Sequence, residues 1–378
     1  MRSKLNSLCA YAKGKIAVEN LNAQSYISTE NMMPNKGGIV AASSLPSVQY
    51  TQQYLKGDVL VSNIRPYFKK IWMAEYDGGC SNDVLVFRAN SSCDPNFLYY
   101  VLANDVFFDY ATATSKGTKM PRGDKTAIMQ YEVPDFDMDA QLRIGKLLRS
   151  LDDRIATNKK INDNLQQQAL AIFQQELLRD GKLPEGWTNS SLLDIANYLN
   201  GLAMQKFRSA EGEIGLPVLK IKELRQGSCD ASSELCSPSI KPEYIIHDGD
   251  VIFSWSGSLL VDLWCGGTCG LNQHLFKVTS EKYPKWFYYA WTAHHLTRFV
   301  AIAADKATTM GHIKREELAK AAVVIPDAVS MERIDGILQP MYDLIISNRI
   351  ENRKLATLRD SLLPRLMSGE IDVSNIEI

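Results

Sequence analysis

The sequence of 378 residues contains no apolar run that approaches the roughly 20 residues needed to cross a bilayer. Its first residues, MRSKLNSLCAYAKGK, lack the sustained apolar stretch of a signal peptide. Only seven cysteines occur, an odd number with irregular spacing, which is typical of a reduced cytosolic protein and not of a disulfide-bonded secreted one. We therefore expect a cytoplasmic protein without a membrane segment.

Familiar catalytic and metal-binding motifs are also missing. The sequence has no GxxxxGK(S/T) loop, no GxSxG, no HExxH and no Asn/Asp-Pro-Pro-aromatic tetrapeptide of the amino-methyltransferases. Cys229, Cys236, Cys265 and Cys269 lack the CxxC spacing of a zinc site, so buried thiols are expected. A nuclease centre of paired carboxylates would have to lie in the acidic run 134–139, which is better explained as a helix cap. We expect no self-contained active site and no metal.

The charge of the chain is nearly balanced. There are 42 lysines and arginines against 43 aspartates and glutamates, which gives a net charge of −1. A dedicated nucleic-acid binder usually has a basic surface. Any contact with nucleic acid must therefore be local, or a partner must supply the remaining positive charge.

The most informative pattern present is that the second half repeats the first at a nearly constant offset of 190 residues. Examples of matching positions are Phe97 with Phe287, Lys116 with Lys306, Thr118 with Thr308, Met120 with Met310, and Arg143 with Arg333. Solenoid repeats are only about 20–50 residues long. The chain therefore contains two copies of a whole domain.

Each copy ends in a segment with apolar residues spaced alternately by four and three. This heptad pattern predicts two long coiled-coil helices, over residues 139–179 and 329–372. Pro340 lies inside the second helix and is expected to kink it or to mark its true start. The remaining segments, 1–138 and 180–328, combine short β-type runs with one aromatic helical stretch each, so the predicted fold class is α+β.

Four asparagines occupy core positions of the predicted coiled coil: Asn158, Asn162, Asn348 and Asn352. Buried asparagines fix the register of a coiled coil by pairing with one another. Antiparallel helices would pair Asn158 with Asn352 and Asn162 with Asn348, whereas parallel helices would pair Asn158 with Asn348. We expect the antiparallel arrangement. The alternative is that these side chains face solvent and the apolar core is narrower.

The strongest local positive charge lies in residues 116–125, which contain four cations and one anion beside two glycines and a proline. Such a loop could bind phosphates through its cations and threonines, or it could simply be solvated. Its recurrence in both halves favours phosphate contacts. The candidates are Lys116, Thr118, Lys119, Arg122 and Lys125 in the first half, and Lys306, Thr308, His312, Lys314 and Arg315 in the second.

The segments that follow the Gly-Asp-Val turns differ between the copies. Residues 62–70 read SNIRPYFKK, whereas residues 254–260 read SWSGSLL. Divergence is expected where each copy recognises a different sequence of bases. The candidate base contacts are Arg65, Lys69 and Lys70 in the first half, and Lys206 and Arg208 in the second, with Lys220, Lys222 and Arg225 as a further possibility.

At this point the chain resembles the specificity subunit of Type I restriction–modification enzymes. The resemblance rests on the two domains separated by helices with repeated asparagines, on the string Leu183–Trp187 that opens the second domain, and on the C-terminal string 355–371. It covers essentially the whole chain. One departure is that the counterpart of Trp187 would fall before Met1, so about ten residues of the usual opening are missing from the first domain. Either the true start lies upstream, or this domain opens differently.

The resemblance implies a non-catalytic subunit that recognises double-stranded DNA. Residues 1–138 and 180–328 would be two target recognition domains, each recognising one half of a split target. The helices at 139–179 and 329–372 would set the spacer and dock two methyltransferase subunits, which restriction subunits then join. S-adenosylmethionine, ATP and Mg²⁺ would belong to those partners. Two alternatives remain, a symmetric coiled-coil adaptor without DNA recognition and a nuclease with an unrecognised centre.

Overall fold

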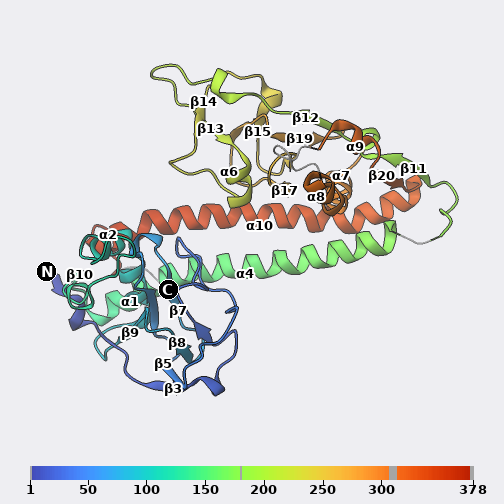
Figure 1. The fold of residues 1–378 in the computed structure, drawn as a ribbon. Coiled ribbons are helices and arrows are strands. Elements are labelled where there is room, and N and C mark those ends of the chain that lie inside the picture. The colour runs from blue at the N-terminus through green and yellow to red at the C-terminus, as the bar shows by residue number, and fades with distance from the viewer. Residues whose placement is uncertain (1, 179–180, 306–312, 375–378) are drawn as a thin grey trace. The chain divides into compact units, whose positions relative to one another are not determined.

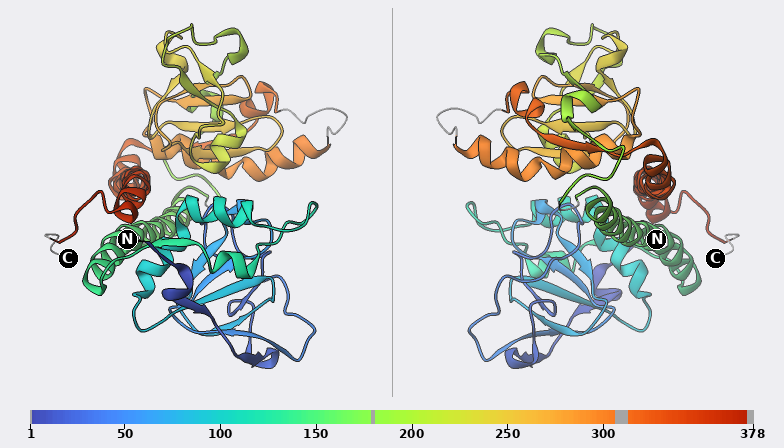
Figure 2. Two further views of the ribbon diagram at one scale, coloured as in Figure 1. Left: turned by 90° about the vertical axis from the view of Figure 1, so that its left-hand side faces the viewer. Right: turned by 90° about the vertical axis from the view of Figure 1, so that its right-hand side faces the viewer.

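The computed structural model describes residues 2–178, 181–305 and 313–374 (Figure 1). The chain divides into two compact units. The first unit consists of residues 1–154 with 355–378, and the second unit consists of residues 155–354. In Figure 2 the strands of the first half, in blue, form one β-rich body, and those of the second half, in yellow and orange, form another. No described helix is long and apolar enough to span a membrane.

The first unit contains two four-stranded sheets and one two-stranded ladder. The antiparallel sheet has the order β2 (Cys9–Tyr11), β9 (Val84–Ala89), β6 (Val59–Ser62) and β7 (Ile71–Met73). The second sheet has the order β3 (Lys15–Ala17), β5 (Tyr50–Tyr54), β8 (Gly78–Cys80) and β4 (Tyr26–Ile27), with β4 parallel to β8. The ladder pairs β1 (Arg2–Lys4) with β10 (Glu132–Pro134).

The second unit repeats this plan. Its antiparallel sheet has the order β12 (Asn197–Asn200), β19 (Leu275–Thr279), β16 (Val251–Ser254) and β17 (Leu260–Leu263). Its other sheet has the order β14 (Leu235–Cys236), β13 (Leu216–Leu219), β18 (Cys269–Leu271) and β15 (Ile245–Ile246), with β13 parallel to β18. The ladder pairs β11 (Thr188–Ser191) with β20 (Ala322–Ile325). The remaining strand of this sheet pairs at opposite edges in the two copies. In the first unit β3 pairs with β5, and in the second β14 pairs with β13.

Both units contain short helices besides their strands. The sequence predicts one helical stretch over 96–110 and another over 284–303, and each is in fact two helices. The first unit has α1 (Pro95–Ala103), α2 (Asp105–Ala113) and α3 (Lys125–Ile128), and the second has α5 (Leu192–Ile195), α6 (Ile221–Gln226), α7 (Lys285–His294), α8 (Leu296–Asp305) and α9 (Arg315–Ala319). Asn104 separates α1 from α2 because its extended backbone ends the first helix and its side chain caps the second.

Two long helices complete the fold, α4 (Met138–Leu177) and α10 (Ala328–Ser368). The acidic run at 134–139 does supply the expected cap, because the Asp137 carboxylate accepts from the backbone N–H of Ala140 at 2.8 Å. α10 ends at Ser368 and not at 372, because Gly369 adopts a left-handed conformation and the backbone N–H of Glu370 bonds back to Arg365. Pro340 does not mark the start of α10, which begins twelve residues earlier.

Within each unit, α4 and α10 contribute to one core, mostly through predicted heptad positions, although Leu363 and Leu366 of α10 lie outside that pattern. In the first unit, Ile144 and Leu148 of α4 share a core with Leu363 and Leu366 of α10. In the second unit, Ala169 of α4 shares a core with the opposite end of α10, including Ile334 and Leu338. The start of α4 thus meets the end of α10, and its end meets the start, so the predicted α+β class with two long antiparallel helices is confirmed.

The four asparagines all belong to the second unit and form the antiparallel pairs. Asn348 Nδ2 donates to Asn162 Oδ1 at 2.9 Å, and Asn158 Nδ2 donates to Asn352 Oδ1 at 3.0 Å. Asn162 Nδ2 also donates to the carbonyl of Ile345 at 3.1 Å. Asn158, Asn162 and Asn348 are buried. Because each amide meets a polar partner only in this alignment, a shift by one heptad would leave buried amides unpaired.

We predict that Asn348→Leu destabilises the chain by about 1–3 kcal/mol, because Asn162 Oδ1 loses its donor while buried. The double variant Asn162→Leu/Asn348→Leu should recover most of this loss, since both polar groups are then removed together. Denaturant unfolding of the single and double variants gives the coupling energy. Asn164→Ala is the control, because Asn164 is exposed and lies on α4, the helix that carries Asn162. Additive losses in the double variant would show that the pair does not act as a unit.

Candidate functional site

Both halves make the same backbone bond between the divergent loop and the basic segment, 116–125 in the first half and 306–315 in the second. In the first half the N–H of Gly123 donates to the carbonyl of Asn63 at 3.1 Å. In the second half the N–H of Ile313 donates to the carbonyl of Trp255 at 3.0 Å. Asn63 directly follows β6, and Trp255 directly follows β16. In the first copy the two segments that the sequence singled out therefore lie side by side, and in the second copy the divergent loop meets the described end of its basic segment.

In the first half, further bonds join these two segments into one surface. The N–H of Arg65 donates to the carbonyl of Pro121 at 2.8 Å, and Ile64 forms a β-bridge with Arg122. Lys116 and Arg122 exchange backbone bonds of 2.8 and 2.9 Å, which close the basic loop into a tight hairpin. We call residues 63–70 and 116–125 together the basic face.

Several cations of the basic face are held by carboxylates. Lys116 Nζ lies 2.5 Å from Asp124, and Arg122 lies 3.1 Å from Asp83. The hydrogen bond from Lys116 holds the pKa of Asp124 below its ordinary value, and backbone bonds from α3 add to this effect. These two cations, both proposed from sequence as phosphate contacts, thus shape the loop. Asp124 lies in the same loop as Lys116, whereas Asp83 is 39 positions before Arg122, so the local pattern gave no sign of that second partner.

Lys69 and Lys70 are also engaged. Lys69 Nζ lies 3.0 Å from Asp105, the first residue of α2, which pairs with Lys36 as well. Lys70 Nζ donates to the carbonyl of Thr29 at 2.6 Å, and partial burial lowers its pKa. The aspartates and the carbonyl therefore neutralise or occupy four of the cations near this face.

Three cations of the basic face have no ion pair within the described part of the chain, namely Arg65, Lys119 and Lys125. Lys119 and Lys125 are exposed, as is Thr118. The Arg65 guanidinium lies 6.0 Å from the centre of the Phe68 ring. Arg65 also has a left-handed backbone, with φ of +49°, and the matching position in the second half is Gly257, with φ of +63°. The fold thus needs a left-handed residue here, which glycine adopts readily and arginine does not.

In the second half the structure describes only part of the predicted site. Lys206, Arg208, Lys314 and Arg315 are all exposed. Lys306, Thr308 and His312 lie outside the described residues. Lys220 and Lys222 pair with Glu234 and Asp230 at 2.6 and 3.6 Å, and Arg225 bonds to Ser258 in the divergent loop.

Polar side chains that the sequence did not single out surround the divergent loop of the second half. Trp255 Nε1 donates to Asn200 Oδ1 at 3.0 Å, and Ser256 Oγ lies 3.1 Å from His274 Nδ1. Gln273 Nε2 lies 3.4 Å from the other nitrogen of His274. These side chains come from the ends of β12 and β16 and from the turn before β19. Amides, hydroxyls and imidazoles are groups that recognise base edges.

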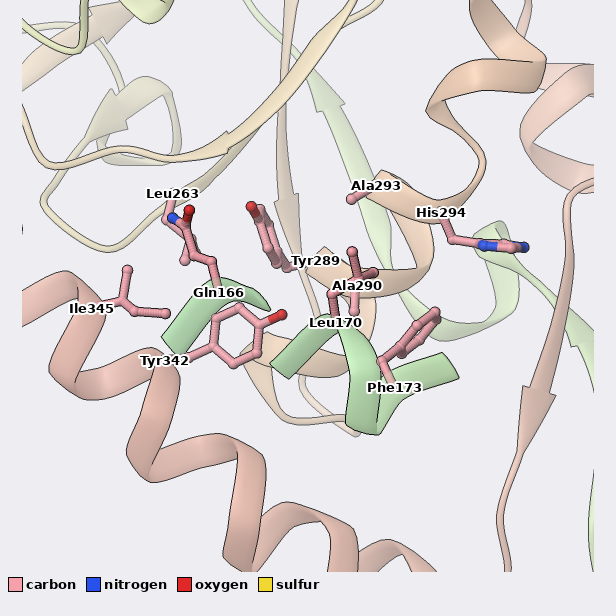
Figure 3. A pocket seen from close by; sticks show the side chains of 10 residues that line it. All are labelled: Gln166, Leu170, Phe173, Leu263, Tyr289, Ala290, Ala293, His294, Tyr342 and Ile345. Atoms are coloured by element: carbon pink, nitrogen blue, oxygen red, sulfur yellow. The ribbon is translucent and has the colours of Figure 1, made fainter. Parts of the chain in front are cut away.

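A pocket of about 310 Å³ lies within the second unit (Figure 3). Its lining is mostly apolar and includes Phe173, Tyr289, Ala290 and Tyr342. Ala290 is the repeat counterpart of Tyr100, whose hydroxyl donates to Asp152 in the first unit at 2.6 Å. The pocket thus lies where a tyrosine ring of the first copy has no equivalent. Its lining contains no carboxylate or thiol, and its polar side chains are those of Gln166, His294 and the two tyrosines.

Metal chemistry finds no support in the described residues either. They contain no group of three or more histidine, cysteine, aspartate or glutamate side chains placed to hold a metal ion. All seven cysteines are free thiols, and every one except the half-buried Cys229 is buried.

Comparison with known proteins gives the same result for both halves. The family model for the Type I restriction modification DNA specificity domain matches residues 1–167 and again residues 184–358. The Type I restriction enzyme MjaIX specificity subunit of Methanocaldococcus jannaschii is 23% identical over 302 residues, which cover 74% of this chain and 70% of that protein. The HindI specificity subunit of Haemophilus influenzae is 21% identical over 434 residues, which cover 92% and 94%.

A solved structure shares the fold. The crystal structure of the S subunit of a Type I restriction–modification system from M. genitalium aligns with a TM-score of 0.60 and 15% identity, over 97% of this chain and 96% of that one. The two family matches together span most of the sequence, and each contains one α+β domain and part of a long helix. The chain therefore belongs to the family of Type I restriction–modification DNA specificity subunits, with two specificity domains in one polypeptide.

Proposed function

We propose that each α+β domain recognises one half of a two-part DNA target. The observation that carries this proposal is the backbone bond shared by the two copies, Gly123 to Asn63 and Ile313 to Trp255. It holds a different set of side chains at the same place in each domain. Such a scaffold lets each copy recognise its own bases while the fold stays constant.

The chain itself is a non-catalytic subunit. We infer that it acts with two methyltransferase subunits docked on α4 and α10, and that restriction subunits join this assembly. S-adenosylmethionine, ATP and Mg²⁺ would bind to those partners. The near-neutral charge of the chain supports this division, since the partners would supply further positive charge around the DNA. We place the assembly in the cytoplasm.

Sequencing of methylated adenines in a host that carries the chain with its methyltransferase tests this function directly. We expect one motif made of two short specified halves separated by an unspecified spacer of fixed length. A continuous motif would contradict recognition by two separate domains. An unmethylated genome, despite an active methyltransferase, would favour an adaptor without DNA recognition.

The long helices lead to a prediction about the spacer. Seven residues inserted after Arg154 in α4, together with seven inserted after Lys354 in α10, leave every contact within each unit intact. The insertion adds about 10 Å of helix, so the spacer should lengthen by about three base pairs while both half-targets stay the same. Methylation sequencing measures both properties. An insertion in α4 alone is the control. The asparagine pairs of the second unit and the core that α4 and α10 share in the first unit can then no longer form together, so methylation should be abolished. A change in the half-targets would show that the helices contribute to base recognition.

The unpaired cations of the basic face give a second prediction. Lys119→Ala/Lys125→Ala should weaken binding of the methyltransferase complex to all DNA sequences alike. If each lysine contacts one phosphate, the slope of log affinity against log salt should decrease by about 0.9 for each. Lys56→Ala is the matched control, since this exposed lysine lies in the turn at the opposite end of β6. An unchanged slope would remove the two lysines from the DNA interface.

Arg65 gives a third prediction. Arg65→Gly should leave the stability of the chain within about 1 kcal/mol, because relief of the left-handed strain offsets the greater freedom of unfolded glycine. Discrimination at one position of the first half-target should fall by about 1–3 kcal/mol, and the second half should be unaffected. Methylation sequencing and binding competition measure this. Arg65→Lys keeps the charge but not the planar fork, so it too should lose discrimination. An unchanged motif in Arg65→Gly would exclude Arg65 from base recognition.

A further inference from the structure

The turn between β6 and β7 concentrates the unusual backbone geometry of the chain. Four non-glycine residues of the described part have positive φ, namely Asn35, Lys36, Arg65 and Lys69, with values between +49° and +60°. Arg65 and Lys69 flank the one-turn 3₁₀ helix Pro66–Phe68, and the other two lie against it. The N–H groups of Asn35 and Lys36 donate to the carbonyls of Phe68 and Lys69, both at 2.8 Å.

This turn is held from three sides. The Asn35–Lys36 backbone bonds hold one side, and the bond from the Arg65 N–H to Pro121 holds the second. Asp105 of α2 holds the third, since it pairs with Lys36 at 2.8 Å and with Lys69 at 3.0 Å. Burial raises the pKa of Asp105, but the two lysines outweigh it and keep the pKa below its ordinary value. Left-handed residues of this kind persist only where the surroundings fix them, and they cluster at binding sites.

The turn presents two aromatic rings to solvent. Tyr67 is 47% exposed and Phe68 is 38% exposed, and their ring centres lie 4.8 Å apart. The Arg65 guanidinium and the Lys70 ammonium lie 6.0 and 5.9 Å from the Phe68 ring. A rigid, exposed aromatic pair with cations around it has the composition of a surface that stacks on nucleic-acid bases.

The second copy serves as an internal comparison. Its loop is two residues shorter. Gly257 matches Arg65, and Leu260 pairs with Ser254 as Lys70 bonds to Ser62, so only Ser258 and Leu259 stand where the first copy has residues 66–69. Gly257 keeps the left-handed backbone without strain, and Leu259 is half-buried against the core of its unit. The fold therefore does not require an exposed aromatic pair here, nor a strained arginine before it. These side chains belong to the task of the first domain alone.

We propose that Tyr67 and Phe68 form an aromatic wedge that inserts at one base step of the first half-target and unstacks it. This inference rests on the proposed function. It adds a second way to recognise the target, in which the domain selects base steps that unstack easily, besides hydrogen bonds to base edges. Apolar side chains that enter a groove and part a base step are a known means of bending DNA and of selecting flexible steps. The second domain has no such wedge, so only the first half-target should be deformed.

Duplex DNA is favoured over a protein partner by what surrounds the rings. Arg65, with no ion pair in the described residues, lies over Phe68, and the backbone of Arg65 is bonded to the loop that carries Lys119 and Lys125. When this surface approaches a duplex, the rings can contact bases while the cations beside them contact phosphates. A protein contact at this point would bury those cations without a phosphate to neutralise them.

The test uses the full chain in complex with its methyltransferase and duplexes of the motif found by methylation sequencing. Each base pair contains an adenine or a cytosine, so 2-aminopurine and pyrrolocytosine can replace one base at every step in turn. We expect the fluorescence to rise at one step of the first half-target, apart from the methylated adenine, and at no corresponding step of the second. In Tyr67→Ala/Phe68→Ala this rise should disappear, and binding should weaken by roughly 5- to 150-fold.

Two further variants test whether the alanine variant merely misfolds, and whether removal of any exposed ring would have the same effect. Tyr67→Leu/Phe68→Leu keeps the apolar bulk and should retain part of the rise if the alanine variant proves unstable. Tyr50→Ala removes another exposed ring of the same domain, 53% exposed on β5, and should change nothing.

Three results would overturn the wedge. They are no rise within the first half-target for the unmodified chain, an unchanged rise in the alanine variant, and loss of methyltransferase binding in that variant without DNA. Failure of the proposed function is distinguishable, because the unmodified chain would then give no two-part motif at all.

Discussion

The antiparallel pairing of buried asparagines is the constraint on which the rest of the structure depends. Asn348 with Asn162, and Asn158 with Asn352, fix the alignment of α4 and α10. Apolar heptads alone would allow the two helices to slide by seven residues at little cost. The amides forbid this, because they would be buried without partners. With one fixed alignment, the apolar residues of α4 and α10 reach the core of each unit.

The two copies share their backbone contacts and differ in their exposed side chains. The Gly-Asp turn before the central strand is anchored alike in both, by Asp58 with Arg88 at 2.6 Å and by Asp250 with Lys277 at 2.9 Å. The loop beyond that strand is bonded alike too, but its side chains differ. In one copy they are cations and aromatic rings, and in the other they are a tryptophan, serines and a neighbouring histidine. Duplication thus preserves the backbone and leaves the exposed chemistry free to diverge.

The sequence predicts those elements whose residues repeat periodically, and it does not predict side-chain contacts between residues that come together only in the folded chain. Heptad spacing predicts α4 and α10, and the asparagines predict their direction. By contrast, the partners of Lys116 and Lys69 are Asp124 and Asp105, and only the folded chain shows which cations are already neutralised. Asn200 meets Trp255 from a strand 55 positions away, and the left-handed state of Arg65 is visible only beside Gly257. Of the two outcomes expected at Pro340, the start of the helix is wrong, because α10 continues through this proline within an otherwise strong heptad pattern.

The central claim is that two equivalent domains on one antiparallel scaffold each recognise half of a target. A chain in which residues 1–137 are replaced by a second copy of residues 184–327 tests it most directly, since both domains then precede their helix at matching positions. Methylation sequencing with the native methyltransferase should show a motif whose two halves are inverted copies of the original second half, with the spacer unchanged. A motif that still contains the original first half, or one without a repeated half, would contradict the account.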